Sequence, residues 1–228
     1  MKDLLLLHGA IGSAKQLAAL ELLLESDYRV HRLDFEGHGG RAAENASFSF
    51  NGFVENIRVF LEQNDIGQCA IFGYSMGGYA ALAFARQFPE KVSEIITLAT
   101  KFDWSPEVAA KETAMLNPDV IEEKVPKFAA SLHALHAPLD WKTVMNKTGD
   151  LLRELGKGKG LTDEDLGAID VPVLVCLGSE DTMVSQEETT RAAKLLPHAR
   201  MKIIEGGQHM LERTDPALIA GCIREFLG

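Results

Sequence analysis

Residues 69–89 read CAIFGYSMGGYAALAFARQFP, and this stretch decides the fold of the chain. Its first five residues form a short apolar run, which is typical of a strand buried on both faces of a sheet. Residues 77–88 are rich in alanine and glycine and predict a helix that Pro89 stops. A strand that turns sharply into a helix exposes the residue at the turn, Ser75, above the sheet.

The turn itself, GYSMG at residues 73–77, fits the pattern G-x-S-x-G. Such a turn should force Ser75 into a strained backbone conformation. The residues two before and two after it, Gly73 and Gly77, should pass so close to other backbone that only glycine fits. We predict that Ser75 is a nucleophile, which needs a base because a serine hydroxyl reacts poorly at neutral pH. A purely structural, glycine-rich turn is the alternative.

Apolar runs elsewhere in the chain predict five more strands, with stretches of helical spacing between them. We expect strands at residues 4–7, 28–34, 94–99, 171–177 and 200–204, and helices at 14–25, 48–64, 186–196 and 216–227. Strict alternation of strand and helix predicts right-handed crossovers and a parallel sheet. Functional residues should then lie at the carboxyl ends of the strands.

Two later strands end in loops that supply a base and an acid. His209 closes the segment EGGQH after the last strand, and Asp181 closes GSED after the fifth. An imidazole can take the serine proton, and a carboxylate on its other nitrogen fixes the tautomer. We therefore predict a triad of Ser75, Asp181 and His209, in the chain order serine, acid, histidine. Glu180 and Asp103, which also follow strands, are the alternatives for the acid.

The negative charge of a tetrahedral transition state needs two hydrogen-bond donors fixed in advance. The backbone N–H of Met76, at the start of the helix after the turn, is one candidate, and the helix dipole favours it. The second should come from the loop HGAIGS after the first strand. We choose the N–H of Ala10 for this role.

The alternation of strand and helix breaks between residues 103 and 169, where no strand-like run occurs. Helix starts recur there after Ser105, Asn117 and Thr162, whose side chains can cap a first turn. We interpret this stretch as an all-helical cap within one domain. The core would then consist of residues 1–102 and 170–228, with the cap at 103–169.

These motifs resemble the α/β-hydrolase superfamily over nearly the whole chain. His8-Gly9 is similar to its oxyanion loop, and DFEGHG at residues 34–39 to its D-x-P-G-H-G loop, with Glu36 where proline is usual. The resemblance implies a three-layer α/β-hydrolase fold. Its sheet would be minimal, six-stranded and mostly parallel, and would lack the first hairpin. The turn GYSMGG is similar to those of small esterases, thioesterases and the lyases of menaquinone synthesis.

Together these residues predict a serine hydrolase that cleaves a carboxylic ester or thioester through an acyl-enzyme on Ser75. A cofactor-independent lyase of the menaquinone-pathway type, which uses the same triad as a base, is one alternative. A small-molecule receptor on the same fold is another.

Several bulky or titratable side chains in the cap have no role in this scheme. His133 and His136 are spaced to share a helix face, but no further ligands accompany them, so we predict no metal site. They could instead line the acyl or alcohol pocket. Trp104, Met115 and Trp141 are expected to pack within the cap, with substrate contact for one of them.

The amino-acid composition and net charge limit the classes of molecule that the chain is expected to bind. Of the 228 residues 46% are hydrophobic, and the formal net charge is −10. An acidic surface repels phosphate backbones and anionic lipid headgroups, which disfavours nucleic acid and membrane partners. Three widely spaced cysteines without a CxxC motif predict reduced thiols, and the apolar runs around Cys69 and Cys176 predict that these two are buried. With no signal-peptide pattern and no apolar run near the ~20 residues of a membrane helix, we expect a cytoplasmic protein with a small-molecule substrate and no cofactor.

Overall fold

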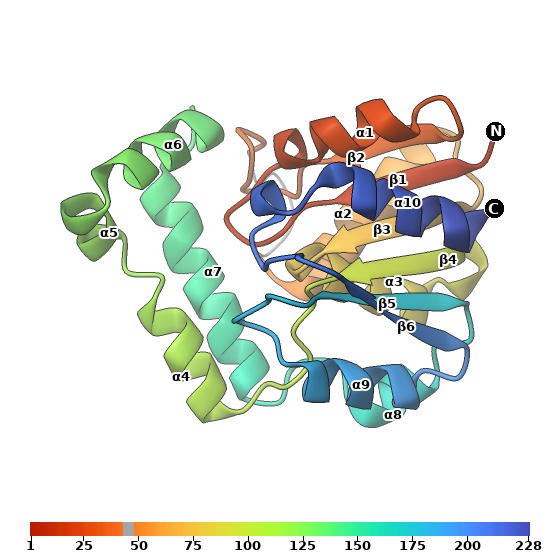
Figure 1. The fold of residues 1–228 in the computed structure, drawn as a ribbon. Coiled ribbons are helices and arrows are strands. Elements are labelled where there is room, and N and C mark those ends of the chain that lie inside the picture. Colours follow the sequence, from red (N-terminus) through yellow and green to blue (C-terminus); the bar gives the residue numbers. More distant parts are fainter. Residues whose placement is uncertain (43–47) are drawn as a thin grey trace.

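The computed structural model describes residues 1–42 and 48–228. Within them, six strands form one sheet in the order β2-β1-β3-β4-β5-β6, and every neighbouring pair is parallel (Figure 1). This confirms the predicted sheet, which proves to be parallel throughout. The strands are β1 (Asp3–Leu7), β2 (Arg29–Leu33), β3 (Cys69–Tyr74), β4 (Val92–Leu98), β5 (Val173–Gly178) and β6 (Ala199–Ile204).

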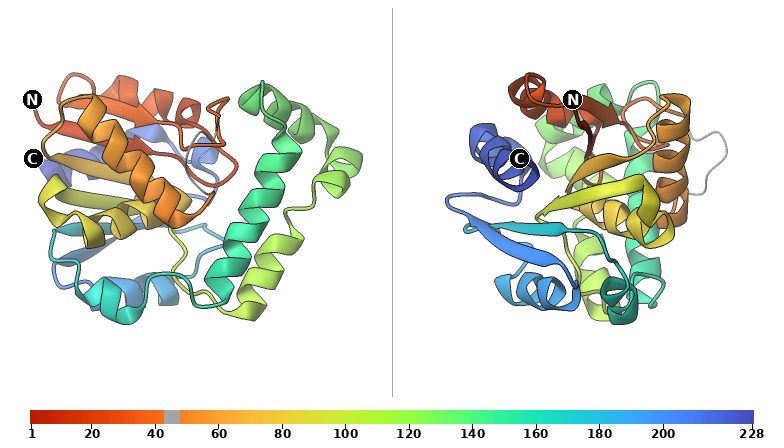
Figure 2. Two further views of the ribbon diagram at one scale, coloured as in Figure 1. Left: turned by 180° about the vertical axis from the view of Figure 1, so that it is seen from behind. Right: turned by 90° about the vertical axis from the view of Figure 1, so that its right-hand side faces the viewer.

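Helices cover both faces of the sheet and make three layers (Figures 1 and 2). One face carries α1 (Ala18–Leu24), which continues the 3-10 turn η1 (Ala14–Leu17), and α10 (Pro216–Leu227). The other carries α2 (Phe50–Gln63), α3 (Met76–Gln87), α8 (Asp163–Gly167) and α9 (Gln186–Leu195). Two further 3-10 turns are η2 (Pro89–Lys91) and η3 (Leu211–Arg213).

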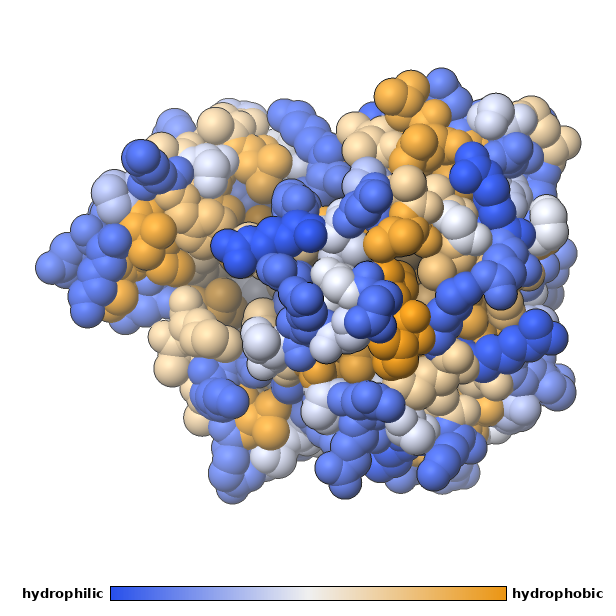
Figure 3. Space-filling model, in the orientation of Figure 1, coloured by the Kyte–Doolittle hydropathy of each residue, from blue (hydrophilic) through white to orange (hydrophobic). Residues whose placement is uncertain are grey.

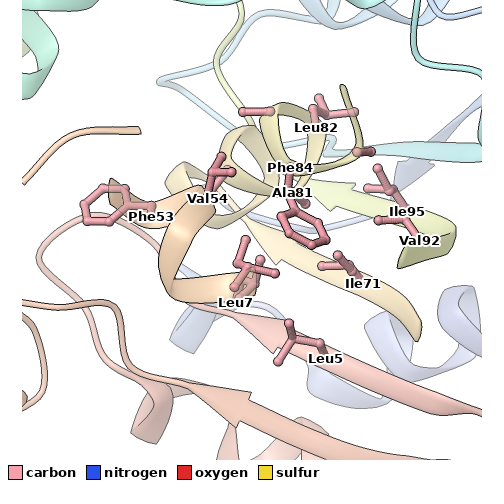
Figure 4. Close-up of a cluster of buried hydrophobic side chains, with 14 of the residues drawn as sticks. Leu5, Leu7, Phe53, Val54, Ile71, Ala81, Leu82, Phe84, Val92 and Ile95 are labelled. Atoms are coloured by element: carbon pink, nitrogen blue, oxygen red, sulfur yellow. The ribbon is translucent and has the colours of Figure 1, made fainter. Parts of the chain in front are cut away.

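The core lies on both sides of the sheet because strand side chains alternate between its faces. In β1, Leu5 and Leu7 pack beneath α2 and α3, whereas Leu4 and Leu6 pack beneath α1 and α10. All four are fully buried, and each contributes roughly 1.5–3 kcal/mol by leaving water. Figure 4 shows part of the first of these clusters, with Phe84 of α3 above the strands. The sheet is therefore a rigid platform for the loops at its carboxyl edge.

Between β4 and β5 the chain leaves the sheet and forms helices beside its carboxyl edge (Figure 1). Ser105, Asn117 and Thr162 cap α4, α5 and α8, as predicted. None of the described helices is long and apolar enough to cross a membrane. The four helices of this segment that precede α8 are α4 (Pro106–Ala114), α5 (Pro118–Lys124), α6 (Pro126–His136) and α7 (Trp141–Gly156).

The packing of these helices bears on the extent of the cap. Helix α4 lies along α7, and a small apolar cluster around Trp141 and Met145 joins α6 to α7. Helix α8 instead packs against α9 and α3 of the core. We propose residues 103–169 as the inserted segment, with α4–α7 as the cap proper and α8 as its return to the core.

The three cysteines are free and buried, which confirms the predicted burial of Cys69 and Cys176. Cys69 lies in β3, Cys176 in β5 and Cys222 in α10. Burial raises the pKa of Cys69 to about 12, so this thiol stays protonated and unreactive at neutral pH.

Candidate active site

Ser75 lies in the turn between β3 and α3 with a φ of 50° and a ψ of −114°, a conformation that L-residues rarely adopt. The predicted strain is therefore present. A Cβ atom on Gly73 would lie 2.4 Å from the Cα atom of Gly78, and one on Gly77 would lie 2.5 Å from the carbonyl oxygen of Leu7. Larger side chains at either position would displace the turn, which confirms why glycine is needed there.

Two hydrogen bonds to residues at or just after the end of β4 hold the turn in place. The N–H of Ser75 donates to the carbonyl of Leu98 at 2.8 Å. The hydroxyl of Thr100 donates to the carbonyl of Ser75 at 3.1 Å. Both backbone polar groups of Ser75 are thus engaged, and its side chain is left for chemistry. Thr100 was not predicted from the sequence, where its one signal is its position two residues after β4, the strand that neighbours β3.

The imidazole of His209 is hydrogen-bonded to the carboxylate of Asp181. Its Nδ1 atom lies 2.9 Å from Oδ2 and 3.2 Å from Oδ1. The Asp181 side chain is fully buried, and that of His209 is 14% exposed. Oδ1 also accepts the N–H groups of Met183 at 2.8 Å and Val184 at 2.9 Å. This leaves Nε2 of His209 as the ring nitrogen free to exchange a proton.

The protonation state of Asp181 follows from competing effects. Burial raises the pKa of Asp181, but the hydrogen bonds from His209 and from the backbone N–H groups of Val184 and Met183 together lower it by more than burial raises it. The net pKa lies below the ordinary value for aspartate, so the group is a carboxylate at neutral pH. A buried carboxylate in this place keeps the proton of a neutral imidazole on Nδ1 and stabilises the imidazolium.

The two alternative acids lie elsewhere. Glu180 is exposed, and its carboxylate accepts a hydrogen bond from the Gln208 amide at 3.2 Å. Asp103 accepts one from the guanidinium of Arg191 at 3.1 Å. Of the three carboxylates considered from the sequence, the structure places Asp181 against the imidazole.

The loop that carries His209 is tied to the serine turn. The hydroxyl of Tyr74, the residue before Ser75, donates to the carbonyl of His209 at 2.8 Å. Burial raises the pKa of Tyr74, which keeps this hydroxyl protonated. Among the described residues no hydrogen bond joins Ser75 to His209, but this tie brings their loops side by side. Sequence reasoning missed Tyr74, although it stands directly before the predicted nucleophile at a strand end.

The loop after β1 lies against the other side of the turn. A Cβ atom on Gly9 would lie 2.6 Å from the Tyr74 ring and 3.5 Å from the Cβ atom of Ser75. Ala10 follows directly. Within the part of the chain that the structure describes, neither the N–H of Ala10 nor that of Met76 donates to a protein acceptor. Both groups are free to bind an oxyanion, as the predicted role requires.

His8 joins this loop to the one after β2. Its Nδ1–H donates to the carbonyl of Gly9 at 2.7 Å, and its Nε2 accepts the N–H of Phe35 at 3.2 Å. Burial lowers the pKa of His8 to about 4, so the ring is neutral, as one donor and one acceptor require. Asp34 adds a second link by accepting the N–H of Ala14 at 2.7 Å.

A cavity of about 400 Å³ lies where the cap joins the core, between the chain segments that enter and leave it. Tyr79, Trp104 and Arg191 are among its lining residues, whereas Ser75, Asp181 and His209 are not. The other two bulky cap residues differ from each other, since Trp141 is buried and Met115 is exposed. Figure 3 shows further exposed apolar side chains on the cap, and a hollow between cap and core. The exposed large apolar side chains of the cap are those of Met115, Val120, Val125 and Phe128.

The two cap histidines do not act as a pair. His133 is exposed and His136 is buried. The described residues contain no group of three or more histidine, cysteine or acidic side chains that could hold a metal ion.

Comparison with known proteins places this geometry in a family. The family model described as serine aminopeptidase, S33, matches residues 2–216. The chain belongs to this α/β-hydrolase family. The hydrolase is 26% identical over 247 residues to pimeloyl-(acyl-carrier protein) methyl ester esterase of Aeromonas hydrophila. The aligned region covers 99% of this chain and 95% of the relative.

Two further similarities agree with this assignment. The hydrolase is 22% identical over 236 residues to carboxylesterase YbfK of Bacillus subtilis, which covers 99% of the chain and 80% of the relative. The solved structure of NosK from Streptomyces actuosus superposes with a TM-score of 0.86 at 22% identity, over 99% of this chain and 96% of that one. The fold predicted from the sequence is thus confirmed, and ester hydrolases are among the named relatives.

Proposed function

We propose that this chain is a serine hydrolase that cleaves a carboxylic ester or thioester through an acyl-enzyme on Ser75. The observation that carries the proposal is the buried Asp181 carboxylate against Nδ1 of His209, on a loop tied to the strained turn of Ser75. A structural turn would need neither the strain nor an oriented imidazole beside it. Among the relatives, a methyl ester esterase and a carboxylesterase support an ester as the bond that is cleaved.

The geometry supports the following reaction. The Ser75 hydroxyl attacks the substrate carbonyl while Nε2 of His209 takes its proton. The negative oxygen of the tetrahedral intermediate is bound by the N–H groups of Ala10 and Met76. The imidazolium, stabilised by Asp181, returns the proton to the departing alcohol or thiol. Water then attacks the acyl-serine with His209 as base, and the acid is released with Ser75 restored.

The proposal includes a small-molecule substrate, no cofactor and a cytoplasmic location. Three buried, free thiols fit a reducing compartment. The net charge of −10 disfavours a polyanionic partner. The cap exposes apolar side chains (Figure 3), and such side chains are suited to contact an apolar acyl or alcohol group.

A fluorophosphonate probe tests the nucleophile directly. It should label the protein once, and peptide mapping should place the label on Ser75. Ser75→Ala is the matched control and should remain unlabelled while its circular dichroism spectrum stays unchanged. A folded wild-type protein that the probe does not label would refute the proposed role of Ser75.

A further inference from the structure

His136, at the end of cap helix α6, connects the cap to two loops of the core. Its Nδ1 atom accepts the N–H of Gly39 at 3.1 Å, and its Nε2–H donates to the carbonyl of Ile11 at 3.0 Å. The residue is 1% exposed. The two bonds fix one neutral tautomer, with the proton on Nε2. One buried side chain of the cap therefore bridges the loop after β1 and the loop after β2.

Ile11 lies next to Ala10 in a tight turn. The N–H of Gly12 donates to the carbonyl of Gly9 at 3.2 Å, so Ala10 and Ile11 are the two central residues. Ile11 has a φ of 51°. A turn with positive φ at its third residue normally uses glycine or asparagine there, and a β-branched residue in this conformation is a true outlier. Such strain persists only where the surroundings hold it.

The cap provides that hold in two ways. It binds the carbonyl of Ile11 through His136, and it packs the Ile11 side chain against the apolar cluster of Trp141 and Met145. If the cap released Ile11, relaxation to negative φ would open the turn and remove the constraint that it places on the backbone of Ala10. The residue next to Ala10 is thus contacted by a side chain 125 positions further along the chain.

The same region of the cap approaches the second loop very closely. Gly40 has a φ of 86°, and a Cβ atom there would lie 2.6 Å from the carbonyl oxygen of Ala137, the residue after His136. The ring of His38 packs edge-on against that of His136, with centroids 6.0 Å apart. The loop after β2 therefore accommodates the end of α6 and fixes its position.

We propose that His136 is a positioning residue for the oxyanion hole, and that docking of the cap through His136 and Ile11 holds the N–H of Ala10 in place. This inference rests on the proposed function and adds a role for the cap to it. Closure of the cap over a substrate would then complete the catalytic site. A partly open cap would leave Ser75, His209 and Asp181 intact and weaken only the stabilisation of the oxyanion.

The test compares His136→Ala with His133→Ala, the matched control on the same helix, whose side chain is exposed and has no partner among the described residues. With a p-nitrophenyl ester, His136→Ala should lower kcat by about 10- to 100-fold and leave KM within about threefold, because one oxyanion donor is worth ~10²–10³ in kcat. His133→Ala should stay within about twofold of wild type. His136→Gln, which retains a donor for Ile11, should recover part of the loss.

Two readouts separate positioning from a merely structural role. A trifluoromethyl ketone forms a tetrahedral adduct on the serine, so its affinity should fall by the same factor as kcat/KM in His136→Ala. A side chain that only stabilised the fold would lower the melting temperature without changing either quantity in folded protein. If His136→Ala does not fold, His136→Gln carries the same comparison with a smaller expected loss.

Hydrogen exchange distinguishes failure of this inference from failure of the proposed function. The amide of Gly12 should exchange at least about tenfold faster in His136→Ala than in wild type or His133→Ala, and this measurement needs no turnover. Unchanged exchange at Gly12 together with an unchanged kcat would overturn the inference. A wild-type protein that neither turns over esters nor reacts with the fluorophosphonate would overturn the proposed function, while the exchange data would still show whether His136 holds the turn.

Discussion

The two halves of the candidate site are held in different ways. The half with Asp181 and His209 is built on loops of β5 and β6, where the backbones touch and the N–H of Glu180 donates to the carbonyl of Gly207 at 2.8 Å. The half with Ala10 is built on the loop after β1, and its strained residue Ile11 is held by the cap. Under the proposed mechanism, proton transfer would thus depend on loops of the core, whereas the oxyanion donor Ala10 would depend on the cap.

The largest expected effect tests the half that belongs to the core. Asp181→Asn removes the charge that fixes the tautomer of His209 and should lower kcat by about 10³- to 10⁴-fold with little change in KM. Steady-state kinetics on a p-nitrophenyl ester measures this. Glu180→Gln is the matched control and should retain wild-type kcat. Equal losses of kcat in both variants would contradict the assignment of Asp181 as the acid.

The next effect concerns the junction between the two halves. Gly77→Ala would bring a Cβ atom to 2.5 Å from the carbonyl of Leu7, just before the oxyanion loop. We expect it to lower the free energy of unfolding by about 2–4 kcal/mol, because the contact is with backbone that cannot yield. Chemical denaturation checks this. Gly67→Ala, where no atom lies within 4 Å, should change stability by less than about 1 kcal/mol.

A smaller expected effect is the pH dependence of folding stability, to which the half with Ala10 should contribute through its buried histidines. Burial lowers the pKa values of His8, His38 and His136, all of which lie on the oxyanion side. An unfolded histidine binds a proton below about pH 6.5, and folded His8 only below about pH 4. The unfolded state therefore binds more protons in this window, and stability falls as the pH is lowered through it, by up to ~1.4 kcal/mol per pH unit for one histidine.

Thermal unfolding between pH 7 and pH 4.5 measures this loss. His8→Asn should unfold with a shallower dependence on pH than wild type, whatever its stability at pH 7. His198→Asn, which alters an exposed histidine paired with Asp170, should keep the wild-type slope. If His8→Asn and wild type share one slope, His8 does not contribute to the acid sensitivity.

The sequence predicted much of the core half because the relevant signals are local. The strand and helix patterns around Ser75 require only neighbouring residues, and all six strands fall within two residues of their expected bounds. Loops that follow parallel strands must meet at one edge, so Asp181 and His209 could be proposed from chain order alone. The capping residues Ser105 and Asn117 are equally local and were predicted for the same reason.

The cap half could not be predicted because its contacts join residues far apart in the chain. His136 and His133 carry the same side chain on one helix, and only packing against the core makes the first buried and the second exposed. The partners of His136, Gly39 and Ile11, lie on two loops that the sequence does not connect to it. Positive φ at Ile11 runs against local preference and results from tertiary structure.

In the proposed mechanism Ser75 carries the acyl group from the attack on the ester until water releases the acid. The most direct measurement is the intact mass of the protein after rapid quenching during turnover of a slow ester, with peptide mapping of the adduct. We expect one acyl group on Ser75, and none in Ser75→Ala. Product release with no acyl mass on the protein, as in an elimination or a direct attack by water, would contradict it.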